Sequence, residues 1–317
     1  MNLSLSNVEA YGKVAVLLGG DSAEREVSLA SGHAVLTALL QAGVDAHPFD
    51  PSSRSIYELV SEKFDRAFII LHGRGGEDGV LQGALEQLKI PYTGSGVLGS
   101  ALAMDKIYSK LVWSARDLPT ADYRVLDKQT YQSAECEQIL KDLGGVVMVK
   151  PSNEGSSLGM ARAENSPQLA RAVQNAFEYD DNVLVETYID GPEYTVAILD
   201  GQALPSIRMT SPNVFYDYDA KYKTDTTQYF CPSGLPLAEE QQLGQLALTA
   251  FEALSGSGWG RIDVMRHQNG TFYLLESNTV PGMTTKSLVP KAAKQAGLSF
   301  EELVLTILEE SLKPHGK

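Results

Sequence analysis

The 317-residue sequence lacks several features that mark other classes of protein. It has no run of lysine and arginine and a formal net charge of −14, so nucleic acid is not an expected partner. No apolar run approaches the roughly 18 residues that a membrane span needs, and residues 1–13 lack the regions of a signal peptide. Its two cysteines match no metal or redox spacing. We therefore expect a soluble, cytoplasmic protein that binds neither nucleic acid nor a membrane.

Two common nucleotide-binding patterns are also missing. No G-x-x-x-x-G-K-[ST] occurs, so the chain is not a Walker-type NTPase. Residues 94–99 fit G-x-G-x-x-G, the pattern of dinucleotide-binding dehydrogenases, but Ile90–Thr93 before them is short and contains a proline. Because the βαβ context and a placed ribose-binding acid are not evident, we reject a dehydrogenase. We expect these glycines to shape a turn before a helix.

The composition is that of a globular protein, with 43% hydrophobic and 21% charged residues over a length that suits two or three domains. Lys13–Leu18 is a short apolar run that is followed by a glycine turn and a helical pattern to about Ala42. Arg66–Leu71 is a second buried strand. This order predicts an N-terminal α/β domain.

Two loops follow the ends of these strands, one at Gly19-Gly20 and the other at His72–Gly79. Ligands of open α/β sheets bind beyond the carboxyl ends of strands, so both loops could face one crevice. Glu24 and His72 are the candidate ligand-binding side chains there. The alternatives are that Glu24 is a first-turn acid favoured by the helix dipole and that His72 is bonded to backbone in a turn.

A second candidate site follows the strand Gly145–Lys150. The Gly/Ser-rich stretch 151–159 comes next, and a strand resumes at Met160, so the stretch is the tip of a hairpin. Its backbone N–H groups could wrap phosphate oxygens, with Lys150 as a point charge beside them. The alternative is a plain flexible hairpin loop. Farther on, Glu186 and Glu193 flank a Gly-Pro break, where they could hold a ribose or adenine or simply end their strands.

The stretch from Thr210 to Gly234 is long, polar and rich in tyrosine. Loops of this length inside a compact domain are usually lids or disordered segments. Its four tyrosines argue against permanent disorder, so we expect a lid.

The most informative segment is the hairpin on either side of Asn269-Gly270. Asn-Gly between two apolar runs predicts a type I′ turn, because both central residues of that turn need φ > 0. Counting outward from these two residues pairs Asp263 with Glu276 and Arg261 with Asn278. Side chains alternate along a strand, so these four share one face, and we expect Ile262, Val264 and Leu275 to point into a core.

Two carboxylates directly opposite each other in a sheet lie about 5 Å apart. At an effective dielectric near 20 they repel by roughly 3 kcal/mol, so a shared proton, an arginine or a divalent cation is needed. Asp263, Glu276 and Asn278 supply the hard oxygen ligands that Mg²⁺ prefers, and we favour the metal. The alternative is a solvated polar face on which Arg261 is the counter-charge.

Together, these segments resemble the D-alanine–D-alanine ligases of the ATP-grasp superfamily. The resemblance runs in order over nearly the whole chain and rests on Gly19–Ser28, Leu71–Gly79, Tyr92–Gly96, Lys150–Ser157, Gly191–Glu193, Asp219–Tyr222, Gly260–Val264 and Glu276–Thr284. It implies an α/β protein, α+β in part, with an ATP-grasp fold preceded by an N-terminal α/β domain with a parallel sheet. The implied domains are 1–105, 106–192 and 193–317, the last with a lid at 210–234.

The resemblance also implies an activity, the ATP-dependent joining of two D-alanines through an acylphosphate, with release of ADP and phosphate, for peptidoglycan synthesis. A homodimer is implied as well. Two Mg²⁺ ions, or Mn²⁺ in their place, would be held by Asp263, Glu276 and Asn278. The residues implied to bind ATP are Lys106, Lys150, Ser156, Ser157, Glu186, Glu193, Phe215 and Lys221, the last at the γ-phosphate.

The remaining implied residues act on the amino acids. Arg261 and the backbone N–H of Gly282 would stabilise a developing oxyanion, and Glu24, Ser156 and Tyr222 would bond together and close the site. Glu24 would hold the ammonium group of the first D-alanine, with His72 nearby. Ser287, with Leu288 beside it, would take the carboxylate of the second.

Two other functions are compatible with parts of this pattern. Another ATP-grasp ligase, such as one that makes D-alanyl-D-lactate, would share most of the motifs, although Tyr222 favours D-alanine as the second substrate. A nucleotide-binding protein without catalysis would not need Arg261 beside a carboxylate and amide set.

Overall fold

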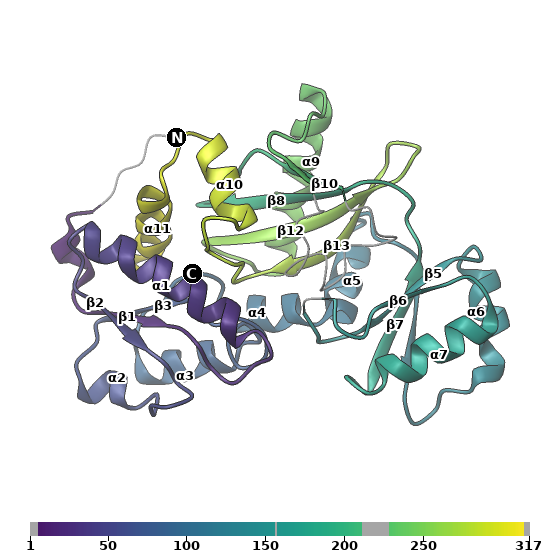
Figure 1. Ribbon diagram of the computed structural model, residues 1–317, viewed down its shortest axis with the longest axis horizontal. Helices are drawn as coiled ribbons and strands as arrows, with labels where there is room; N and C mark the ends of the chain where they lie inside the picture. The colour runs from purple at the N-terminus through teal and green to yellow at the C-terminus, as the bar shows by residue number, and fades with distance from the viewer. Residues whose placement is uncertain (1–5, 156, 211–227, 314–317) are drawn as a thin grey trace.

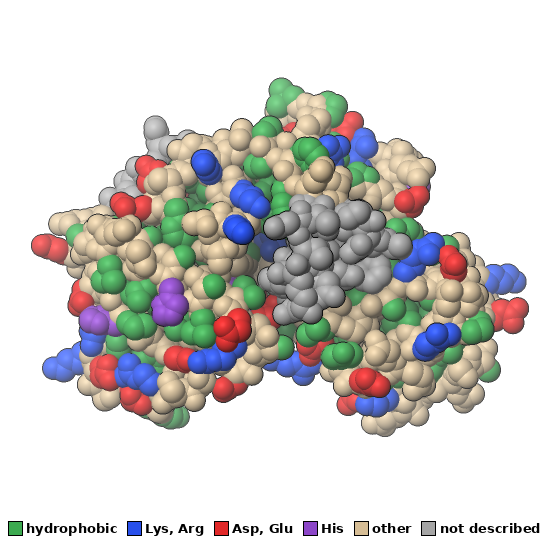
Figure 2. Space-filling view, in the orientation of Figure 1, with side chains coloured by type: hydrophobic (Ala, Val, Ile, Leu, Met, Phe, Trp, Pro, Cys, Tyr) green, Lys and Arg blue, Asp and Glu red, His purple; other side chains and the backbone are tan. Residues whose placement is uncertain are grey.

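The computed structural model describes residues 6–155, 157–210 and 228–313, and its strands form three sheets (Figure 1). The first sheet is parallel and the other two are antiparallel. Helices pack against all three sheets, and the architecture confirms the predicted α/β fold class. In the view of Figure 2, acidic and basic side chains are interspersed over the coloured surface. Within the described residues no helix has both the length and the apolar character that a membrane crossing requires.

The first sheet lies in the N-terminal part of the chain, with strand order β2-β1-β3. Every residue of β1 and β3 is buried, so the sheet needs apolar cover. Part of that cover comes from the other end of the chain, because the C-terminal helices share this core. The elements are η1 (Val8–Tyr11), β1 (Val14–Leu17), α1 (Arg25–Gln41), β2 (Ala46–Phe49), α2 (Glu58–Ser61), β3 (Arg66–Ile69), α3 (Val80–Leu88), α10 (Leu288–Gln295), α11 (Phe300–Glu309) and η3 (Glu310–Leu312).

The second sheet has the order β4-β7-β5-β6 and carries two helices (Figure 1). On the two central strands, side chains alternate between the two faces of the sheet. Val147, Val149, Val183 and Val185 lie on one face and pack with the helices in a separate core. The side chains that alternate with these valines, including Lys150 and Glu186, therefore project from the opposite face. The elements are β4 (Tyr123–Asp127), η2 (Ser133–Glu135), α6 (Cys136–Asp142), β5 (Val147–Pro151), β6 (Ala161–Ala163), α7 (Ser166–Ala176) and β7 (Asn182–Thr187).

The third sheet has the order β11-β10-β8-β12-β13, with β9 paired to β8. One face packs on α9 and on Trp113 of α5, which form a third core with Ile262, Val264 and Leu274. Strand β12 lies between β8 and β13 and is bonded on both sides. The elements are α4 (Val97–Met104), α5 (Lys106–Ala115), β8 (Glu193–Leu199), β9 (Gln202–Ala203), β10 (Ile207–Thr210), β11 (Gln228–Phe230), α9 (Leu237–Ala253), β12 (Trp259–Arg266) and β13 (Phe272–Asn278).

The hairpin of β12 and β13 has the predicted register where it matters for the site. Asp263 pairs with Glu276 and Arg261 pairs with Asn278. The predicted turn, however, is wrong. The N–H of His267 donates to the carbonyl of Thr271 at 2.9 Å, which leaves three residues in the loop, and only Gly270 has positive φ (92°). The Asn269 side chain instead accepts a hydrogen bond from the N–H of Thr271 at 3.0 Å.

A β-bulge restores the predicted pairing of Asp263 with Glu276 in spite of the longer turn. Val264 pairs with Leu274, so Leu275 is an extra residue of β13 between that pair and the pair of Asp263 with Glu276. The extra loop residue shifts the pairing by one position, and the bulge shifts it back. Leu275 is consequently half-buried, whereas Leu274 is fully buried in the core, and the prediction for Leu275 is wrong.

The glycine pattern at residues 94–99 leads into helix α4, as expected for a turn before a helix. A Cβ on Gly99 would lie 2.4 Å from the carbonyl oxygen of Ser255, so this glycine permits a close helix-to-backbone approach.

The stretch predicted as a lid, Thr210–Gly234, falls mostly on residues that the structure does not describe, 211–227. Its end is not all loop, because Gln228–Phe230 forms β11 at the edge of the third sheet. The sequence analysis missed this strand. Pairing with β10 supplies the backbone bonds that make it a strand despite its short length.

Candidate active site

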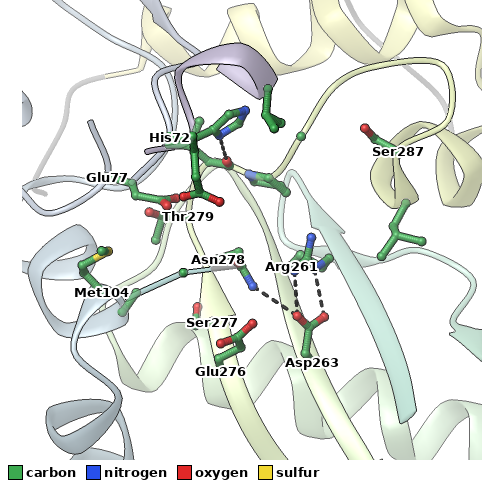
Figure 3. Close-up of a pocket in the computed structure, with 18 of the residues that line it drawn as sticks. His72, Glu77, Met104, Arg261, Asp263, Glu276, Ser277, Asn278, Thr279 and Ser287 are labelled. Atoms are coloured by element: carbon green, nitrogen blue, oxygen red, sulfur yellow. Dashed lines mark hydrogen bonds and ion pairs between the residues drawn. The ribbon is translucent and has the colours of Figure 1, made fainter. Parts of the chain in front are cut away.

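A cleft of about 540 Å³ lies where the three sheets and their loops meet. It is lined from one side by the start of α1 and the loop after β3, and from the other by β12, β13 and the loop that follows β13. Figure 3 shows the side chains of Arg261, Asp263, Glu276 and Asn278 on the neighbouring strands of the hairpin, with His72 and Glu77 opposite. The cleft therefore joins both segments that the sequence analysis singled out.

Asp263 is the most constrained group on the hairpin face. It is 3% exposed and accepts four hydrogen bonds. Arg261 donates through Nε to Oδ1 at 2.8 Å and through Nη2 to Oδ2 at 2.7 Å, the bidentate geometry of a strong charge-assisted pair. The hydroxyl of Thr195 donates to Oδ1 at 2.6 Å, and Nδ2 of Asn278 donates to Oδ2 at 3.2 Å. In this arrangement Arg261 is the counter-charge of Asp263.

Glu276 faces the cleft next to Asp263 and is compensated by a different cation. Its Oε2 lies 3.6 Å from Nζ of Lys106, which is 7% exposed. Lys106 also donates to the carbonyl of Glu154 at 2.7 Å, in the Gly/Ser-rich loop after β5. Among the described residues no group of three or more His, Cys, Asp and Glu side chains is arranged to hold a metal. The two carboxylates and one amide still form a donor set that suits Mg²⁺, provided that Arg261 releases Asp263 and the Asn278 amide turns its oxygen inward.

Three buried charges lie behind this face, on the inner side of the second sheet. Glu186 is 2% exposed, and its carboxylate contacts Lys150 through Oε1 and Lys110 through Oε2, the latter at 2.8 Å. The two lysines lower the pKa of Glu186 to about 2, against the opposing effect of burial, so the carboxylate is ionised. Burial also opposes the charge of Lys150, but attraction to Glu186, Glu276 and Glu193 raises its pKa. Glu193, at the start of β8, lines the cleft.

Two glycine-rich loops meet at Glu24. A Cβ on Gly155 would lie 3.0 Å from Oε2 of Glu24, and one on Gly73 would lie 3.2 Å from the same atom. The loop after β3 and the loop after β5 therefore both approach this carboxylate, and a larger residue at either position would crowd it. Ser157 lies farther along the second loop with φ of 61° and is half-buried.

His72 is 6% exposed and belongs to the cleft wall. Its Nδ1 lies 2.7 Å from the carbonyl oxygen of Val280, so Nδ1 carries the hydrogen of a neutral ring. Burial lowers the pKa of the imidazole below its ordinary value of 6.5, in spite of the nearby Glu24 carboxylate. Within the described residues Nε2 has no hydrogen-bond partner, so it is left as a buried acceptor.

Glu77 is a cleft residue that the sequence analysis missed. Its Oε1 accepts a hydrogen bond from the N–H of Gly73 at 2.9 Å, and it is bonded to the backbone of Val280 as well. Burial, together with the charge of Glu24, raises its pKa to about 8. Its place in a loop rich in glycine and acids was the only available signal, and that signal does not distinguish Glu77 from Asp78.

The loop after β13 holds the remaining candidates. Gly282 and Ser287 both line the cleft, and a Cβ on Gly282 would lie 3.2 Å from the Ser287 hydroxyl. The N–H of Met283 donates to Oγ of Ser31 at 3.0 Å, which ties this loop to α1. Ser287 precedes α10, and Leu288 begins that helix and also lines the cleft.

The structure thus brings together most of the candidate residues that it describes, although Ser157 is not among those that line the cleft. The lining candidates are Glu24, His72, Lys106, Glu193, Arg261, Asp263, Glu276, Asn278, Gly282, Ser287 and Leu288. Lys150 and Glu186 lie behind the cleft and form an ion pair with each other. Lys150 is also attracted by Glu276 and Glu193, which line the cleft. The candidates Ser156, Phe215, Lys221 and Tyr222 lie outside the described residues.

Comparison with known proteins gives two family matches. Residues 112–309 match the model of the D-ala D-ala ligase C-terminus, and residues 48–95 match that of the D-ala D-ala ligase N-terminus. The first match alone covers more than half of the chain. The chain belongs to the D-alanine–D-alanine ligase family.

Individual members of the ligase family are similar over nearly the full length. The D-alanine–D-alanine ligase of Pseudoalteromonas atlantica is 62% identical over 305 residues, 96% of each chain. That of Idiomarina loihiensis is 57% identical over 96% of this chain and 98% of its own. Relatives this close support a shared activity more strongly than the fold does.

Solved structures of the ligase family show the same fold. A D-alanine–D-alanine ligase from Bacillus anthracis complexed with ATP superposes with a TM-score of 0.83 at 32% identity, over 95% of this chain and 97% of that one. A VanG D-Ala:D-Ser ligase from Enterococcus faecalis has a TM-score of 0.80 at 27% identity, over 95% and 99%. Because enzymes named for different second substrates share the fold, the fold alone does not determine which second substrate is used.

Proposed function

We propose that this chain joins two D-alanines to D-alanyl-D-alanine at the expense of ATP, with release of ADP and phosphate, for peptidoglycan synthesis. The observation that carries the proposal is the convergence in one cleft of Glu24, Arg261 and the Asp263, Glu276 and Asn278 set. A carboxylate that can hold an ammonium group lies across from groups suited to phosphate chemistry, as amino-acid activation requires. The similarity to curated D-alanine–D-alanine ligases over 96% of the chain supports this choice of substrate.

The proposed reaction has two steps. The carboxylate of the first D-alanine attacks the γ-phosphorus of ATP, which forms an acylphosphate and expels ADP. The amine of the second D-alanine then attacks the acyl carbon, loses a proton and expels phosphate through a tetrahedral intermediate. Glu24 holds the first ammonium group, with neutral His72 beside it, and Ser287 with Leu288 receives the second carboxylate. Their common cleft supports these assignments.

ATP is proposed to lie between the second and third sheets. Lys106 and Lys150 hold its phosphates, Glu186 and Glu193 hold its adenine and ribose, and Ser157 belongs to the loop that covers them. Lys106, Lys150 and Glu186 are each at least 93% buried. Because water screens such charges little, they act strongly on a bound polyanion. Ser156, Phe215 and Lys221 belong to the same proposal through the family resemblance, as does Tyr222 with Ser156 and Glu24.

Two Mg²⁺ ions, with Mn²⁺ as a substitute, are proposed to be held by Asp263, Glu276 and Asn278. When bound, the metal would neutralise charge on the transferred phosphoryl group. Arg261, freed from Asp263, and the N–H of Gly282 then stabilise the oxyanion of the tetrahedral intermediate. The bidentate contact between Arg261 and Asp263 supports an exchange of partners, in which the arginine holds the carboxylate until the cation replaces it.

We further propose that the chain is divided into the domains 1–105, 106–192 and 193–317, and that the protein is located in the cytoplasm, where ATP is available.

We also propose a homodimer. Exposed apolar side chains support it. Val80 on α3 and Leu98 on α4 are 68% and 59% exposed, and the two helices pack together. Apolar groups gathered on a surface are typical of interfaces.

The proposed activity is tested by measuring phosphate release from ATP and Mg²⁺ with D-alanine, and by detecting the dipeptide. We expect release with D-alanine and little release with L-alanine, because an L-enantiomer with its ammonium group at Glu24 and its carboxyl carbon near Arg261 would direct its methyl group to a different part of the cleft wall. D-alanine mixed with D-lactate or D-serine tests the second substrate. A mixed product formed as readily as D-alanyl-D-alanine would contradict the proposal.

Glu276→Gln is expected to remove most of the turnover while the fold is retained. The change removes one negative charge from the proposed metal site, and several kcal/mol of charge stabilisation correspond to a loss of roughly 100-fold or more. Phosphate release is measured over a range of Mg²⁺ concentrations. Glu301→Gln, the same change at an exposed position of α11, is the matched control and should behave as wild type. Normal turnover of Glu276→Gln at low Mg²⁺ would refute the metal assignment.

Arg261→Ala should lower kcat by roughly 10²–10³-fold, the usual effect of losing an oxyanion donor, with a smaller change in KM for ATP. Arg261→Lys should restore little activity, because an ammonium lacks the planar fork. If Arg261 serves only as the counter-charge of Asp263, kcat will recover at saturating Mg²⁺ and ATP. Measuring kcat under those conditions separates the two roles, and full recovery would rule out oxyanion stabilisation.

Light scattering should give a particle of twice the 34.3 kDa chain mass. Leu98→Glu places a charge among the exposed apolar groups and should shift the mass to that of a single chain, because burying an unpaired carboxylate is costly. Leu237→Glu is the control, since Leu237 is 74% exposed on α9, a different helix. A single-chain mass for the wild type would refute the dimer, and a dimeric Leu98→Glu would refute this interface.

A further inference from the structure

Lys110 is a fully buried lysine to which the proposed reaction gives no role. It lies on α5, outside the second sheet, and its side chain has no exposed surface. Its Nζ is 2.8 Å from Oε2 of Glu186, 2.5 Å from Oγ1 of Thr120 and 3.3 Å from the carbonyl of Ala121. Burial lowers the pKa of Lys110, and attraction to Glu186 opposes that effect. A fully buried ammonium is costly, so its specific contacts call for an explanation.

The contacts form a row of three charges, Lys110, Glu186 and Lys150. Each oxygen of the single carboxylate contacts one of the two ammonium groups. Lys110 approaches from the helix, whereas Lys150 comes from the neighbouring strand β5. The surrounding charges are also acidic: Glu193 and Glu276 act on Lys150, and Asp122 acts on Lys110. Lys150 is therefore drawn by three carboxylates, and Lys110 is positioned to offset the nearest of them.

We propose that Lys110 is a positioning residue for ATP binding. Lys110 contacts one oxygen of Glu186, so that Lys150 stays available to a phosphate. The inference rests on the proposed function, in which Lys150 and Glu186 hold ATP. Without Lys110, the whole charge of Glu186 acts on Lys150, whose ammonium group already contacts Oε1. A phosphate must then compete with that pair for the same point charge. With Lys110 present, Oε2 of Glu186 lies 2.8 Å from a second ammonium group, which compensates part of the negative charge.

The test is the affinity for ATP of Lys110→Met, which keeps the length of the side chain and removes the charge. We expect Kd for ATP, measured by calorimetry, to rise roughly 10- to 100-fold, as for loss of an outer group that orients a ligand-binding side chain. At saturating ATP, kcat and KM for D-alanine should stay close to wild type. Arg66→Met is the matched control. Arg66 is also a buried cation, 9% exposed, but it bonds to Ala10, Tyr11 and Ser311 away from the cleft. It should lower stability without changing Kd for ATP.

A double-mutant cycle with Glu186→Gln separates positioning from general damage. If Lys110 acts by offsetting Glu186, Lys110→Met should weaken ATP binding much less when residue 186 is uncharged. An equal fold-change in both backgrounds, or a change below about twofold in a folded Lys110→Met, would overturn the inference. If Lys110→Met does not fold, Thr120→Val replaces it, because it removes the hydroxyl acceptor of Nζ and should give a smaller rise with the same dependence on residue 186.

The outcome also distinguishes this inference from the proposed function. If the wild-type chain does not release phosphate from ATP with D-alanine, the proposed function fails whatever Lys110 does. If the wild type is active and Lys150→Met weakens ATP binding but Lys110→Met does not, only the positioning role is refuted.

Discussion

The constraint on which the site depends is the position of β12 as an inner strand of the third sheet. Its backbone is bonded to β8 on one side and to β13 on the other, so Arg261 and Asp263 project from a strand that cannot slide. On the opposite face, Ile262 and Val264 are fully buried, which resists any rotation of the strand. A shift by one residue would bury the charges and expose the core. The hydrophobic face of the sheet thus fixes the location of the polar one.

Charge balance follows from this rigidity. Acids and cations that project from fixed strands must be compensated where they stand, because burial makes an unpaired charge costly. Asp263 is balanced by Arg261, Glu276 lies near Lys106, and Glu186 is shared by two lysines. The sequence analysis considered metal or arginine as alternatives for the facing acids. In the structure, arginine and lysine balance them, and the same carboxylates retain the donor types that a cation needs, so the metal stays a prediction.

The sequence predicted the fold class, β1 and β3 of the first sheet, β5 and β6 of the second and the grouping of the hairpin acids, because these depend on local periodicity. It did not predict β2 or β4. It failed where two local effects combine. The type I′ turn and the uniform register were both wrong, and the pairing of Asp263 with Glu276 was right only because the bulge at Leu275 offset the longer turn. The role of Lys110 was equally hidden, because its partner Glu186 is 76 positions away along the chain and periodicity carries no information on such pairs. Glu77 owes its raised pKa to burial and to Glu24, which lies in another loop.

Away from the cleft, the first and last described segments of the chain are held together. Tyr11 donates to Glu309 at 2.6 Å, and Arg66 donates to the carbonyl of Ser311 at 3.0 Å, so the first sheet and the last helix are linked by buried polar contacts as well as by a shared core. The loop with Gly282 and Ser287 lies between β13 and α10, so it is anchored at one end in the third sheet and at the other in the first core. Met283 bonds to Ser31 of α1 within that span. The residues proposed to hold the two amino acids therefore come from one unit, whose segments are tied together by hydrogen bonds and a shared core. The lysines proposed to hold phosphate come from the second sheet and α5. Any motion between these units would change the distance between phosphate and amino acids while leaving each set internally intact.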